Sequence, residues 1–532
     1  MKTQNTSKVF LQGTFILAVS GVVVKVIGSL NWVFLSRILG GEGIGLYQMG
    51  FPVYLLALTL SSAGIPVAIS IITAEKLAHK DYLGAKRVFT LSWRILFCTG
   101  FIFMILMLFG ARWLVDNHWI RDARAYWSII ALAPAVFLVT GMSSMRGYLQ
   151  GWQKMAPTGA SEIIEQIFRV VTMIALAWLL LPYGLEYGAA GASMGAAVGA
   201  LMALILLVAC VWRLHKINKN KFRLDYNSKI VQEKDGSIIK RLFYLALPIS
   251  LSSLMLPVVA NLDMLIVPAR LEVAGYDVSK ATELFGYLTG MAVPLVNLAT
   301  LFTAALAVAL VPAISSSRAA GEHAEIFDKT ATAFRIAVAV TIPAASAIYL
   351  LAEPLARIVY NSPAAANVIQ ISSFAVFFLG LHQVSTGVLQ GLALTKIPVI
   401  TMFFAAVVKV ILNWNMVALP EFGIQGAAIA TCVDMGLAAL INIVFIWHYT
   451  GFTLEFGNLI KVLLATGVMV GAIHLALLTT DTIGNWSLLL AVIVGTVVYI
   501  PIVLKIGGLP KKDARQVPFL GGLFESKFGR FL

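Results

Sequence analysis

Charged residues are scarce in this chain. Only 12% of its 532 residues are charged, whereas 59% are hydrophobic; a soluble domain has about 25% charged residues. This composition excludes an ordinary soluble protein and is typical of a multi-pass membrane protein. The net charge of +14 does not require nucleic acid as a partner, because membrane proteins collect Lys and Arg in their cytoplasmic loops.

Cysteine is also rare. The three cysteines, Cys98, Cys210 and Cys432, lie far apart, each in an apolar run. Their spacing predicts neither a disulfide framework nor a metal site, and we expect no cofactor. A cleavable signal peptide is not expected either, because the first apolar run is long, contains Lys25 and lacks a small-residue cleavage site.

Long apolar runs fill most of the remaining sequence. Fourteen runs are long enough to cross a bilayer as helices, since about 20 residues suffice. We therefore expect an all-α integral membrane protein with fourteen transmembrane helices. The predicted parts are an N-lobe of six helices (1–214), a basic cytoplasmic inter-lobe loop (215–239), a C-lobe of six helices (240–450), two further helices (451–506) and a cytoplasmic tail (507–532).

The distribution of Lys and Arg agrees with fourteen spans. When loops are assigned alternately to the two sides, 27 Lys and Arg fall on the side of the termini and seven on the other side. Positive charge collects in cytoplasmic loops. The count therefore predicts a cell-membrane protein whose two termini are both cytoplasmic.

The two halves of the chain resemble each other. The segment 147–151 reads GYLQG and the segment 387–391 reads GVLQG, and Arg169 matches Lys409 at the same offset. Several collinear matches of this kind indicate an internal duplication. Because each copy has six helices, the copies share one topology and are expected to be related by a pseudo-twofold axis along the membrane normal. The substrate site is then expected between the two lobes.

One apolar run carries unusual charge. Glu162, Glu165 and Arg169 are spaced i, i+3 and i+7, so they share one helical face with Gln166 nearby. A charge at the bilayer centre costs roughly 3 kcal/mol unless it faces protein or water. Two interpretations stay open: an internal Glu165–Arg169 ion pair that locks helices together, or a face that lines a cavity.

Several motifs resemble a known family. The stretch 36–48 (SRILGGEGIGLYQ), the stretch 63–70 (AGIPVAIS), Glu165-Gln166 with Arg169, and 261–270 (NLDMLIVPAR) are similar to the stage V sporulation protein B branch of the polysaccharide transport family. This branch lies in the multidrug/oligosaccharidyl-lipid/polysaccharide (MOP) exporter superfamily and is related to the lipid II flippase MurJ. The resemblance covers essentially the whole chain.

The resemblance implies two lobes with alternating access, and a polyprenyl-pyrophosphate-linked sugar as substrate. Its pyrophosphate needs cations in a cleft of low dielectric. Lys25 stands where the MurJ-like proteins have a cavity arginine, whereas Asn31 replaces a second one. The predicted substrate-binding residues are Lys25, Asn31, Glu162, Glu165, Gln166, Arg169 and Lys409. The alternative is that these cations only pair with buried carboxylates such as Glu165, Asp263 or Asp434.

Three further residues have two open interpretations. Asp263 lies deep in the seventh span and either carries a coupling proton or cation or caps a neighbouring helix. Arg37 and Arg270 lie near the outer ends of the first helix of each lobe. They either form an outer gate or extend to the membrane interface.

The function predicted from these features is a flippase. We expect a cell-wall or spore-wall precursor such as lipid II to be moved from the inner to the outer leaflet by a monomeric protein, driven by a coupling cation or the membrane potential. An alternative is a cation-coupled multidrug exporter of the same superfamily. A membrane glycosyltransferase is disfavoured, because no large outer loop carries a catalytic constellation; no catalytic residue is predicted and the protein is not expected to be an enzyme.

Overall fold

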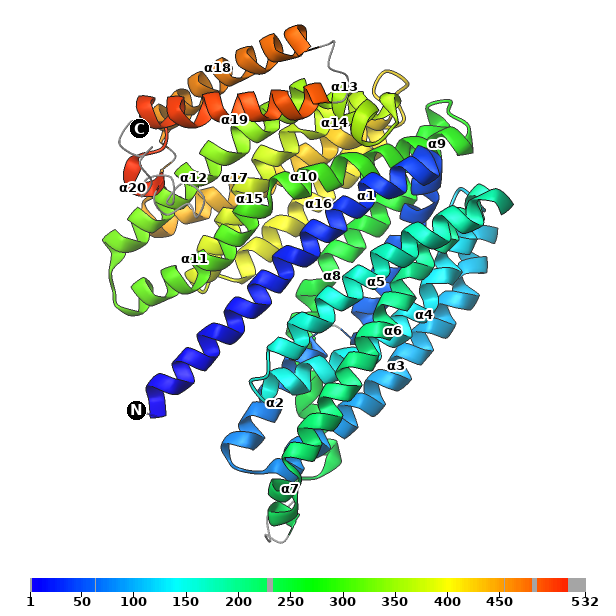
Figure 1. Ribbon diagram of the computed structural model, residues 1–532, viewed down its shortest axis with the longest axis vertical. Helices are drawn as coiled ribbons and strands as arrows, with labels where there is room; N and C mark the ends of the chain where they lie inside the picture. The colour runs from blue at the N-terminus through cyan, green and yellow to red at the C-terminus, as the bar shows by residue number, and fades with distance from the viewer. Residues whose placement is uncertain (1, 63, 227–232, 454, 481–485, 515–532) are drawn as a thin grey trace. The chain divides into compact units, whose positions relative to one another are not determined.

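The computed structural model of the protein is all-helical over the part of the chain it describes, which comprises residues 2–62, 64–226, 233–453, 455–480 and 486–514. Thirteen helical stretches in these residues are long and apolar enough to cross a membrane (Figure 1). The chain divides into two compact units, namely unit 1 (Met1–Ala269 with Asp277–Gly286) and unit 2 (Arg270–Tyr276 with Tyr287–Leu532).

The helices of unit 1 are α1 (Lys2–Ser62), α2 (Ile65–Ala78), α3 (Tyr82–Asp116), α4 (Ala125–Gly151), α5 (Ala156–Leu180), α6 (Leu185–Ile217), α7 (Lys219–Tyr226), α8 (Asp235–Val273), which runs on into unit 2, and α9 (Val278–Gly286). Those of unit 2 are α10 (Val293–Ala299), α11 (Leu301–Ala319), α12 (His323–Leu350), α13 (Ala352–Pro354), α14 (Ala366–Ser372), α15 (Phe374–Gly391), α16 (Lys396–Met416), α17 (Ile424–Thr450), α18 (Phe456–Thr480), α19 (Trp486–Ile506) and α20 (Lys511–Ala514). A π-helix at Tyr287–Ala292 precedes α10.

The first apolar stretch, Val19–Ala78, is 60 residues long. A straight helix of this length would measure about 90 Å, three times the hydrocarbon core of a bilayer. The helix breaks at Gly40, where φ is 65° and ψ is −173°, and again at Gly64, where φ is 75°. The two breaks divide the stretch into shorter helical segments. The total of fourteen spans stays a prediction.

Gly40 adopts a backbone conformation that favours glycine. We expect Gly40→Ala to lower the free energy of unfolding by about 1 kcal/mol, because a Cβ atom is disfavoured at positive φ. Gly21→Ala is the matched control, since Gly21 lies in the same helix with no atom near its added Cβ. Thermal melting in detergent compares the two variants, and an equal melting temperature would contradict the expectation.

Close backbone contacts join α9 to α1 in unit 1. A Cβ atom added at Gly45 would lie 2.0 Å from the carbonyl oxygen of Thr282, and one added at Gly286 would lie 2.0 Å from that of Gly41. Only glycine permits this approach. The GGEGIG segment of the sequence is therefore a helix-packing motif.

A network of ion pairs and hydrogen bonds also stabilises the contact between α1 and α9. Arg124 binds Glu42 at 2.7 Å and Asp122 at 2.8 Å, and Thr282 donates to Asp122 at 2.9 Å. Ser279 donates to Glu42. The hydrogen bond to Asp122 raises the pKa of Arg124 above its usual value. The network fixes the beginning of α9 on unit 1.

The duplication seen in the sequence recurs as matched contacts inside each unit. In unit 1, added Cβ atoms at Gly147 and Gly151 would lie 2.4 Å and 2.9 Å from carbonyl oxygens of α2. In unit 2, the matching Gly387 and Gly391 would meet carbonyl oxygens of α11 at 2.6 Å and 3.1 Å. The repeated glycine pair therefore serves the same purpose in both copies, which is to let one helix lie directly on another.

In a second repeated contact, a glycine of one helix packs on a threonine of another, and the two residue types exchange helices between the copies. Gly100 of α3 packs on Thr140 of α4 in unit 1, whereas Thr341 of α12 packs on Gly380 of α15 in unit 2. The small residue and the threonine have changed places between the copies. The volume at this helix contact is conserved although neither position keeps its residue, as expected of a closely packed interior.

The division into units differs from the expected lobes. The lobe boundary expected in 215–239 stays a prediction, and unit 1, which is defined by contacts, extends to Ala269. The early part of α8 belongs there because Arg241 pairs with Glu75 of α2 and Asn261 donates to the Pro52 carbonyl of α1 at 2.8 Å. Within the expected loop, α6 ends at Ile217, α7 follows, and 227–232 lie outside the described residues.

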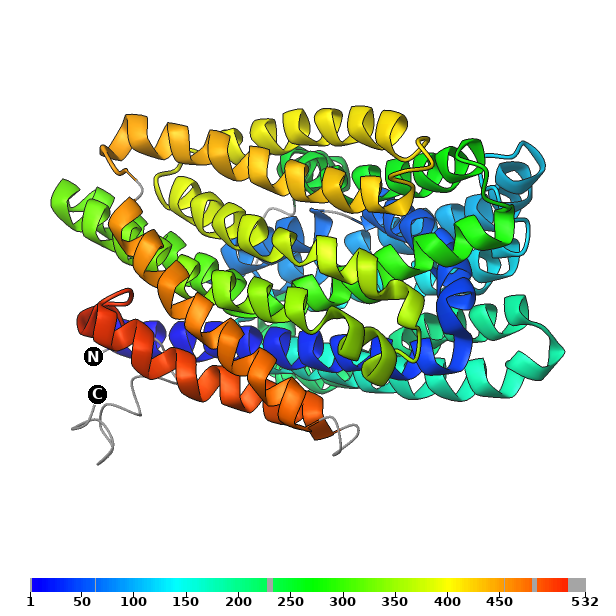
Figure 2. The same cartoon turned by 90° about the horizontal axis from the view of Figure 1, so that it is seen from above.

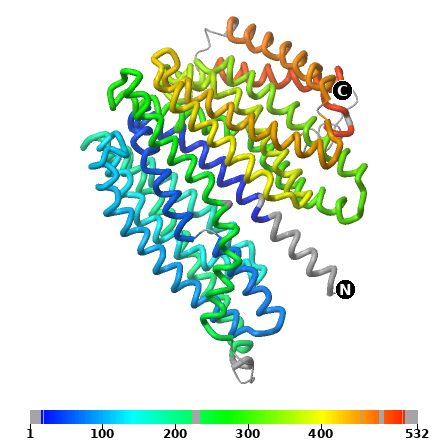
Figure 3. Tube along the Cα trace, turned by 180° about the vertical axis from the view of Figure 1, so that it is seen from behind, coloured from blue at the N-terminus to red at the C-terminus, as the bar shows by residue number. Residues whose placement is uncertain are grey.

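The C-terminal helices α18 and α19 lie side by side in unit 2, as Figure 2 and Figure 3 show in orange and red. Both contact α12, where the Tyr499 hydroxyl donates to the Ala339 carbonyl at 2.6 Å. The expected tail begins with α20, whose Asp513 is buried and binds Arg335 at 2.7 Å. Residues 515–532 of the expected tail lie outside the described residues.

Candidate functional site

Helix α5 carries the polar residues singled out in the sequence, and α6 fixes its position. Added Cβ atoms at Gly191, Gly195 and Gly199 of α6 would lie 2.6, 2.7 and 2.5 Å from carbonyl oxygens of α5. Glycines at every fourth position form a stripe along one face of a helix, and such stripes let membrane helices approach closely. Besides α6, helix α5 contacts α1 and, over a shorter length, α4 (Figure 1).

An ion pair joins α4 to α5. Nη2 of Arg146 lies 2.8 Å from a carboxylate oxygen of Glu165, and the two side chains are only 17% and 15% exposed. Nε of Arg146 also donates to the Ser161 hydroxyl at 3.1 Å. Charge-assisted hydrogen bonds of this kind are strong where water is scarce. Arg146 is therefore held from two sides by the polar face of α5.

Arg169 joins α5 to an aromatic row on α1. Its guanidinium donates to the hydroxyl of Tyr54, and Tyr54 and Tyr47 are each only 3% exposed. Phe51 lies between them, with ring centroids 5.8 Å from Tyr47 and 5.7 Å from Tyr54. Arg169 is itself partly buried. The charges of Arg169 and Arg146 both act on Tyr54, within the same helical unit.

Glu162 and Gln166 complete the polar face. Glu162 is partly buried and lies in the electrostatic field of Arg146 and Glu165. The side-chain nitrogen of Gln166 lies against Gly28 of α1, 3.1 Å from where a Cβ atom would be. Lys25 is exposed one helical turn before Gly28. The structure therefore gathers the predicted residues of α5, together with Arg146, into one cluster that faces α1 and α4.

Three more of the predicted residues belong to unit 1. Asn31 is 4% exposed, and its amide nitrogen contacts the Met173 sulfur at 3.6 Å. Asp263 is partly buried in α8, and Arg37 is exposed on α1 just before the break at Gly40.

The remaining two predicted site residues, Lys409 and Arg270, belong to unit 2. Lys409 of α16 is 6% exposed. Asp434, which was named as a possible partner of the cations, lies on the adjacent α17 and is 5% exposed. Arg270 stacks on the Trp414 ring at 4.6 Å and donates to its carbonyl oxygen at 2.8 Å. This contact holds the Arg270 side chain on the end of α16.

Arg146, Tyr54 and Tyr47 were not predicted as site residues. The sequence places Arg146 close to the end of an apolar run, where basic residues are usually assigned to a loop. The structure places it inside α4, five residues before the end of the helix. An arginine flanked by apolar and small residues, as in Met145-Arg146-Gly147, was the available signal.

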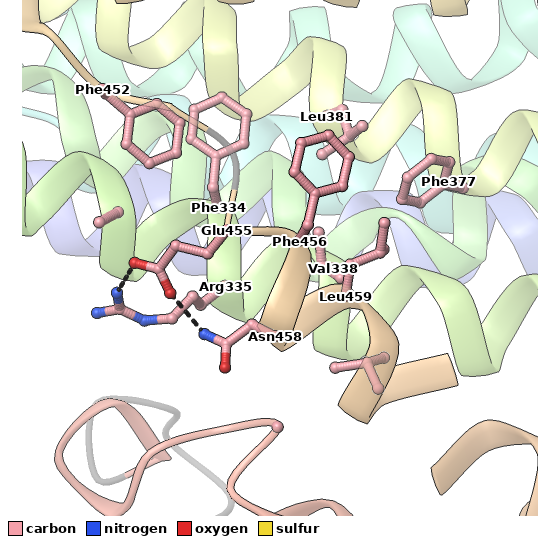
Figure 4. Close-up of a pocket in the computed structure, with 13 residues that line it drawn as sticks. Phe334, Arg335, Val338, Phe377, Leu381, Phe452, Glu455, Phe456, Asn458 and Leu459 are labelled. Carbon is pink, nitrogen blue, oxygen red and sulfur yellow. Dashed lines mark hydrogen bonds and ion pairs between the residues drawn. The ribbon is translucent and has the colours of Figure 1, made fainter. Parts of the chain in front are cut away.

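A separate pocket of about 60 Å³ lies in unit 2 (Figure 4). Its wall is apolar and aromatic, with Phe334, Phe377, Phe452 and Phe456 among the lining residues. At its rim Arg335 binds Glu455 at 2.8 Å. The pocket holds few polar groups and is far smaller than the clefts that hold drug-sized ligands.

The cluster in unit 1 combines two guanidinium groups, two carboxylates and several hydroxyls. Guanidinium groups bind phosphate oxygens in a bidentate manner, and they do so most strongly where water is excluded. No group of three or more His, Cys, Asp or Glu side chains is placed to hold a metal ion within the part of the chain that the structure describes. The chemistry of the cluster therefore favours binding of an oxyanion.

Two family profiles and several relatives match this chain. The family profile described as "Polysaccharide biosynthesis protein" matches residues 10–318, and the profile described as "MatE" matches 288–415. Stage V sporulation protein B of Bacillus subtilis (strain 168) is 30% identical over 97% of this chain and 98% of its own length. Lipid II flippase MurJ of the same organism is 23% identical over 84% of each chain.

A solved structure shares the fold. Lipid II flippase MurJ in an inward closed conformation aligns with a TM-score of 0.69 at 16% identity, covering 92% of this chain and 98% of that one. The family profile spans more than half of the chain, and the relationship to stage V sporulation protein B spans nearly all of it. The chain therefore belongs to the polysaccharide biosynthesis protein family and is related to stage V sporulation protein B over nearly its whole length, as its motifs predicted.

Proposed function

We propose that this membrane transporter moves a polyprenyl-pyrophosphate-linked oligosaccharide, a cell-wall or spore-wall precursor such as lipid II, from the inner to the outer leaflet of the cell membrane by alternating access. The observation that carries the proposal is the pair Arg146 and Arg169, two partly buried guanidinium groups on facing helices of unit 1. The relatives named for lipid II flipping and for sporulation support the same substrate class.

The chemistry of a lipid-linked sugar fits this arrangement. Its pyrophosphate carries about two negative charges, and Arg recognises phosphate oxygens through a planar fork of donors. Lys25, exposed near Gln166, adds a mobile point charge. Asn31, Glu162, Glu165 and Gln166 supply hydrogen-bond partners for phosphate or sugar hydroxyls, and Lys409 is proposed as the cation of unit 2.

Further parts of the proposal concern orientation and driving force. We propose that both termini are cytoplasmic, because Lys and Arg gather in the loops on their side. Asp263 is proposed as a site for a coupling proton or cation, with the membrane potential as an additional driving force, and the protein is proposed to act as a monomer. Arg37 and Arg270 are proposed as an outer gate.

A cation-coupled multidrug exporter is the second candidate. The MatE profile over residues 288–415 favours it. Such an exporter needs a carboxylate to bind a cationic drug or its coupling ion, and it does not need paired guanidinium groups, which would repel a cation. The two candidates therefore differ in the charge of the ligand that the α5 cluster accepts.

Native mass spectrometry of the gently purified protein tests the proposal. We expect the wild type to hold a polyprenyl-pyrophosphate sugar, and Arg169→Ala and Lys25→Ala to lose it. Arg112→Ala is the matched control, because Arg112 pairs with Asp116 at 3.6 Å on the exposed surface of α3. If the wild type held only bulk phospholipid and bound added cationic drugs readily, the exporter would replace the flippase.

A further inference from the structure

We propose that the end of α6 in unit 1 binds an anionic phospholipid of the surrounding membrane. The phosphate of this lipid is held by Arg213, Lys216 and Lys219, and its acyl chains lie along an exposed apolar stripe that leads to these cations. The lipid is a component of the bilayer and not the transported substrate, so the binding goes beyond the proposed function. It uses no residue of α5.

The apolar stripe runs along the exposed side of α6, which is one of the helices long and apolar enough to cross a membrane. Its members are exposed and spaced four, three and four residues apart, which places them on one helical face: Leu201, Ile205, Val208 and Trp212. On the opposite face, Leu207 and Val211 are buried. Because the exposed side of a membrane-spanning helix meets lipid, the stripe is a surface along which acyl chains lie.

Cations follow the stripe at the end of α6. Trp212 is 64% exposed, and Nζ of Lys216, one turn later, lies 5.1 Å from the centroid of its ring. Arg213 and Lys219, the first residue of α7, are exposed as well. Trp rings collect at the level of lipid headgroups, and Lys and Arg side chains extend from there toward the phosphates. These four residues, which we call the basic patch, therefore combine an interfacial ring with three phosphate-binding cations.

The carboxylates at this end of unit 1 bind other cations. Four of them do so in the pairs Glu75–Arg241, Asp81–Lys76, Glu233–Lys76 and Asp235–Arg87. From Tyr187 to Leu224 the sequence contains no Asp or Glu. Over the part of the chain that the structure describes, no ion pair involves the three cations of the basic patch. We therefore expect their balancing anion to come from the membrane.

Contacts of α7 hold the basic patch in place. Phe222 packs edge-on against the rings of His215 and Trp152, with centroids 5.4 Å and 6.3 Å away. Nζ of Lys221 lies 5.5 Å from the ring centroid of Tyr82. The start of α7 is thereby fixed on α3 and on the residue that follows α4. Because the backbone that carries the cations is fixed, binding a phosphate orders few further groups.

A phospholipid with net negative charge fits both parts of this surface. Its phosphate diester meets the cations while its acyl chains meet the stripe, whereas inorganic phosphate would use the cations alone. A zwitterionic lipid gains less, because its own ammonium group is repelled by the patch. Each Lys or Arg near an anionic lipid surface strengthens association roughly fivefold. In the proposed orientation this end of α6 is cytoplasmic, where anionic lipids collect.

Quenching of Trp212 fluorescence by brominated lipid tests the inference. The full chain is reconstituted into phosphatidylcholine vesicles that contain a minor share of brominated phosphatidylglycerol or, for comparison, of brominated phosphatidylcholine with the same acyl chains. The chain has 11 tryptophans, so the signal of Trp212 is the difference between the wild type and Trp212→Phe. We expect half-maximal quenching at a phosphatidylglycerol content at least about fivefold below that of brominated phosphatidylcholine.

Two triple variants, each measured with and without Trp212→Phe, locate the site. Arg213→Gln/Lys216→Gln/Lys219→Gln removes the cations, so we expect the preference for phosphatidylglycerol to disappear. Arg213→Lys/Lys216→Arg/Lys219→Arg keeps the charges and should keep the preference.

Arg318→Gln/Lys396→Gln/Lys505→Gln is the matched control, because it removes the same charge from exposed positions of unit 2 and should behave as the wild type. Equal quenching by the two lipids in the wild type would overturn the inference. A preference that survives in the triple glutamine variant of the patch, or that disappears in the control, would overturn the assignment to the end of α6.

Two measurements on the wild type still decide if a variant fails to fold. Raising the ionic strength should reduce the preference, because salt screens exposed charges, and an unchanged preference contradicts charge recognition. Glycerol phosphate lacks acyl chains and should not displace the lipid; displacement at equal concentration would contradict the part assigned to the stripe. None of these experiments measures transport, so a negative result leaves the proposed function untouched.

Discussion

Arg146→Ala is expected to abolish transport of a lipid-linked sugar and to destabilise the protein. The substitution removes a phosphate-binding cation and leaves the Glu165 carboxylate, 15% exposed, without its Arg146 partner. Loss of one partner of a buried ion pair costs about 3–5 kcal/mol. The measurements are the melting temperature in detergent and the flipping of a fluorescent polyprenyl-pyrophosphate sugar in proteoliposomes.

A double variant separates the two effects of this substitution. In Arg146→Ala/Glu165→Ala both charges of the pair are removed, so we expect most of the stability to return while transport stays absent. Arg112→Ala/Asp116→Ala removes an ion pair whose side chains are 79% and 65% exposed, and it should change neither property measurably. Transport by the Arg146/Glu165 double variant would show that the pair is only a lock between α4 and α5.

Gly199→Ala is expected to destabilise unit 1 and to weaken the function together. The added Cβ atom would lie 2.5 Å from the carbonyl oxygen of Glu165 and 2.9 Å from Cβ of Arg169. Because the obstacle is backbone, α5 must move away, at a cost of about 1–3 kcal/mol for overpacking. The shift also displaces Glu165 and Arg169 from their partners on α4 and α1.

Gly141→Ala is the matched control for this helix-packing prediction. Gly141 lies within α4 and has no atom within 4 Å of an added Cβ, so alanine should be neutral or slightly stabilising through its helix propensity. The two variants are compared by their melting temperatures and by their binding of a polyprenyl-pyrophosphate sugar. Equal melting temperatures for Gly199→Ala and Gly141→Ala would contradict the close α5–α6 packing.

The α5 stretch illustrates what sequence reasoning reaches. Its length and composition predict a membrane helix, and the spacing of Glu162, Glu165 and Arg169 predicts one polar face, because both depend only on helical geometry. The sequence left open whether Glu165 pairs with Arg169 on the same helix. In the structure, Glu165 binds Arg146 of α4, and Arg169 binds Tyr54 of α1.

The glycines show the same limit from another direction. The repeated GxLQG segments indicated a duplication, but not that their glycines lie on carbonyl oxygens of α2 and α11. Likewise Gly45 and Gly286 are 241 residues apart in the chain, although both belong to the contact between α1 and α9. The spacing of glycines along one helix does not predict which other helix will pack against them.

By itself, then, the sequence determined the membrane environment, the helical class, the duplication and the family, because hydrophobic length, charge bias and collinear motifs are properties of a linear chain. Only the tertiary structure decided that α8 packs with the first unit up to Ala269, that Arg146 belongs to the polar cluster, and which partner each charge of α5 takes. The physical reason is that an ion pair between helices depends on how close their backbones lie, and glycine stripes set that distance through contacts between residues far apart in sequence.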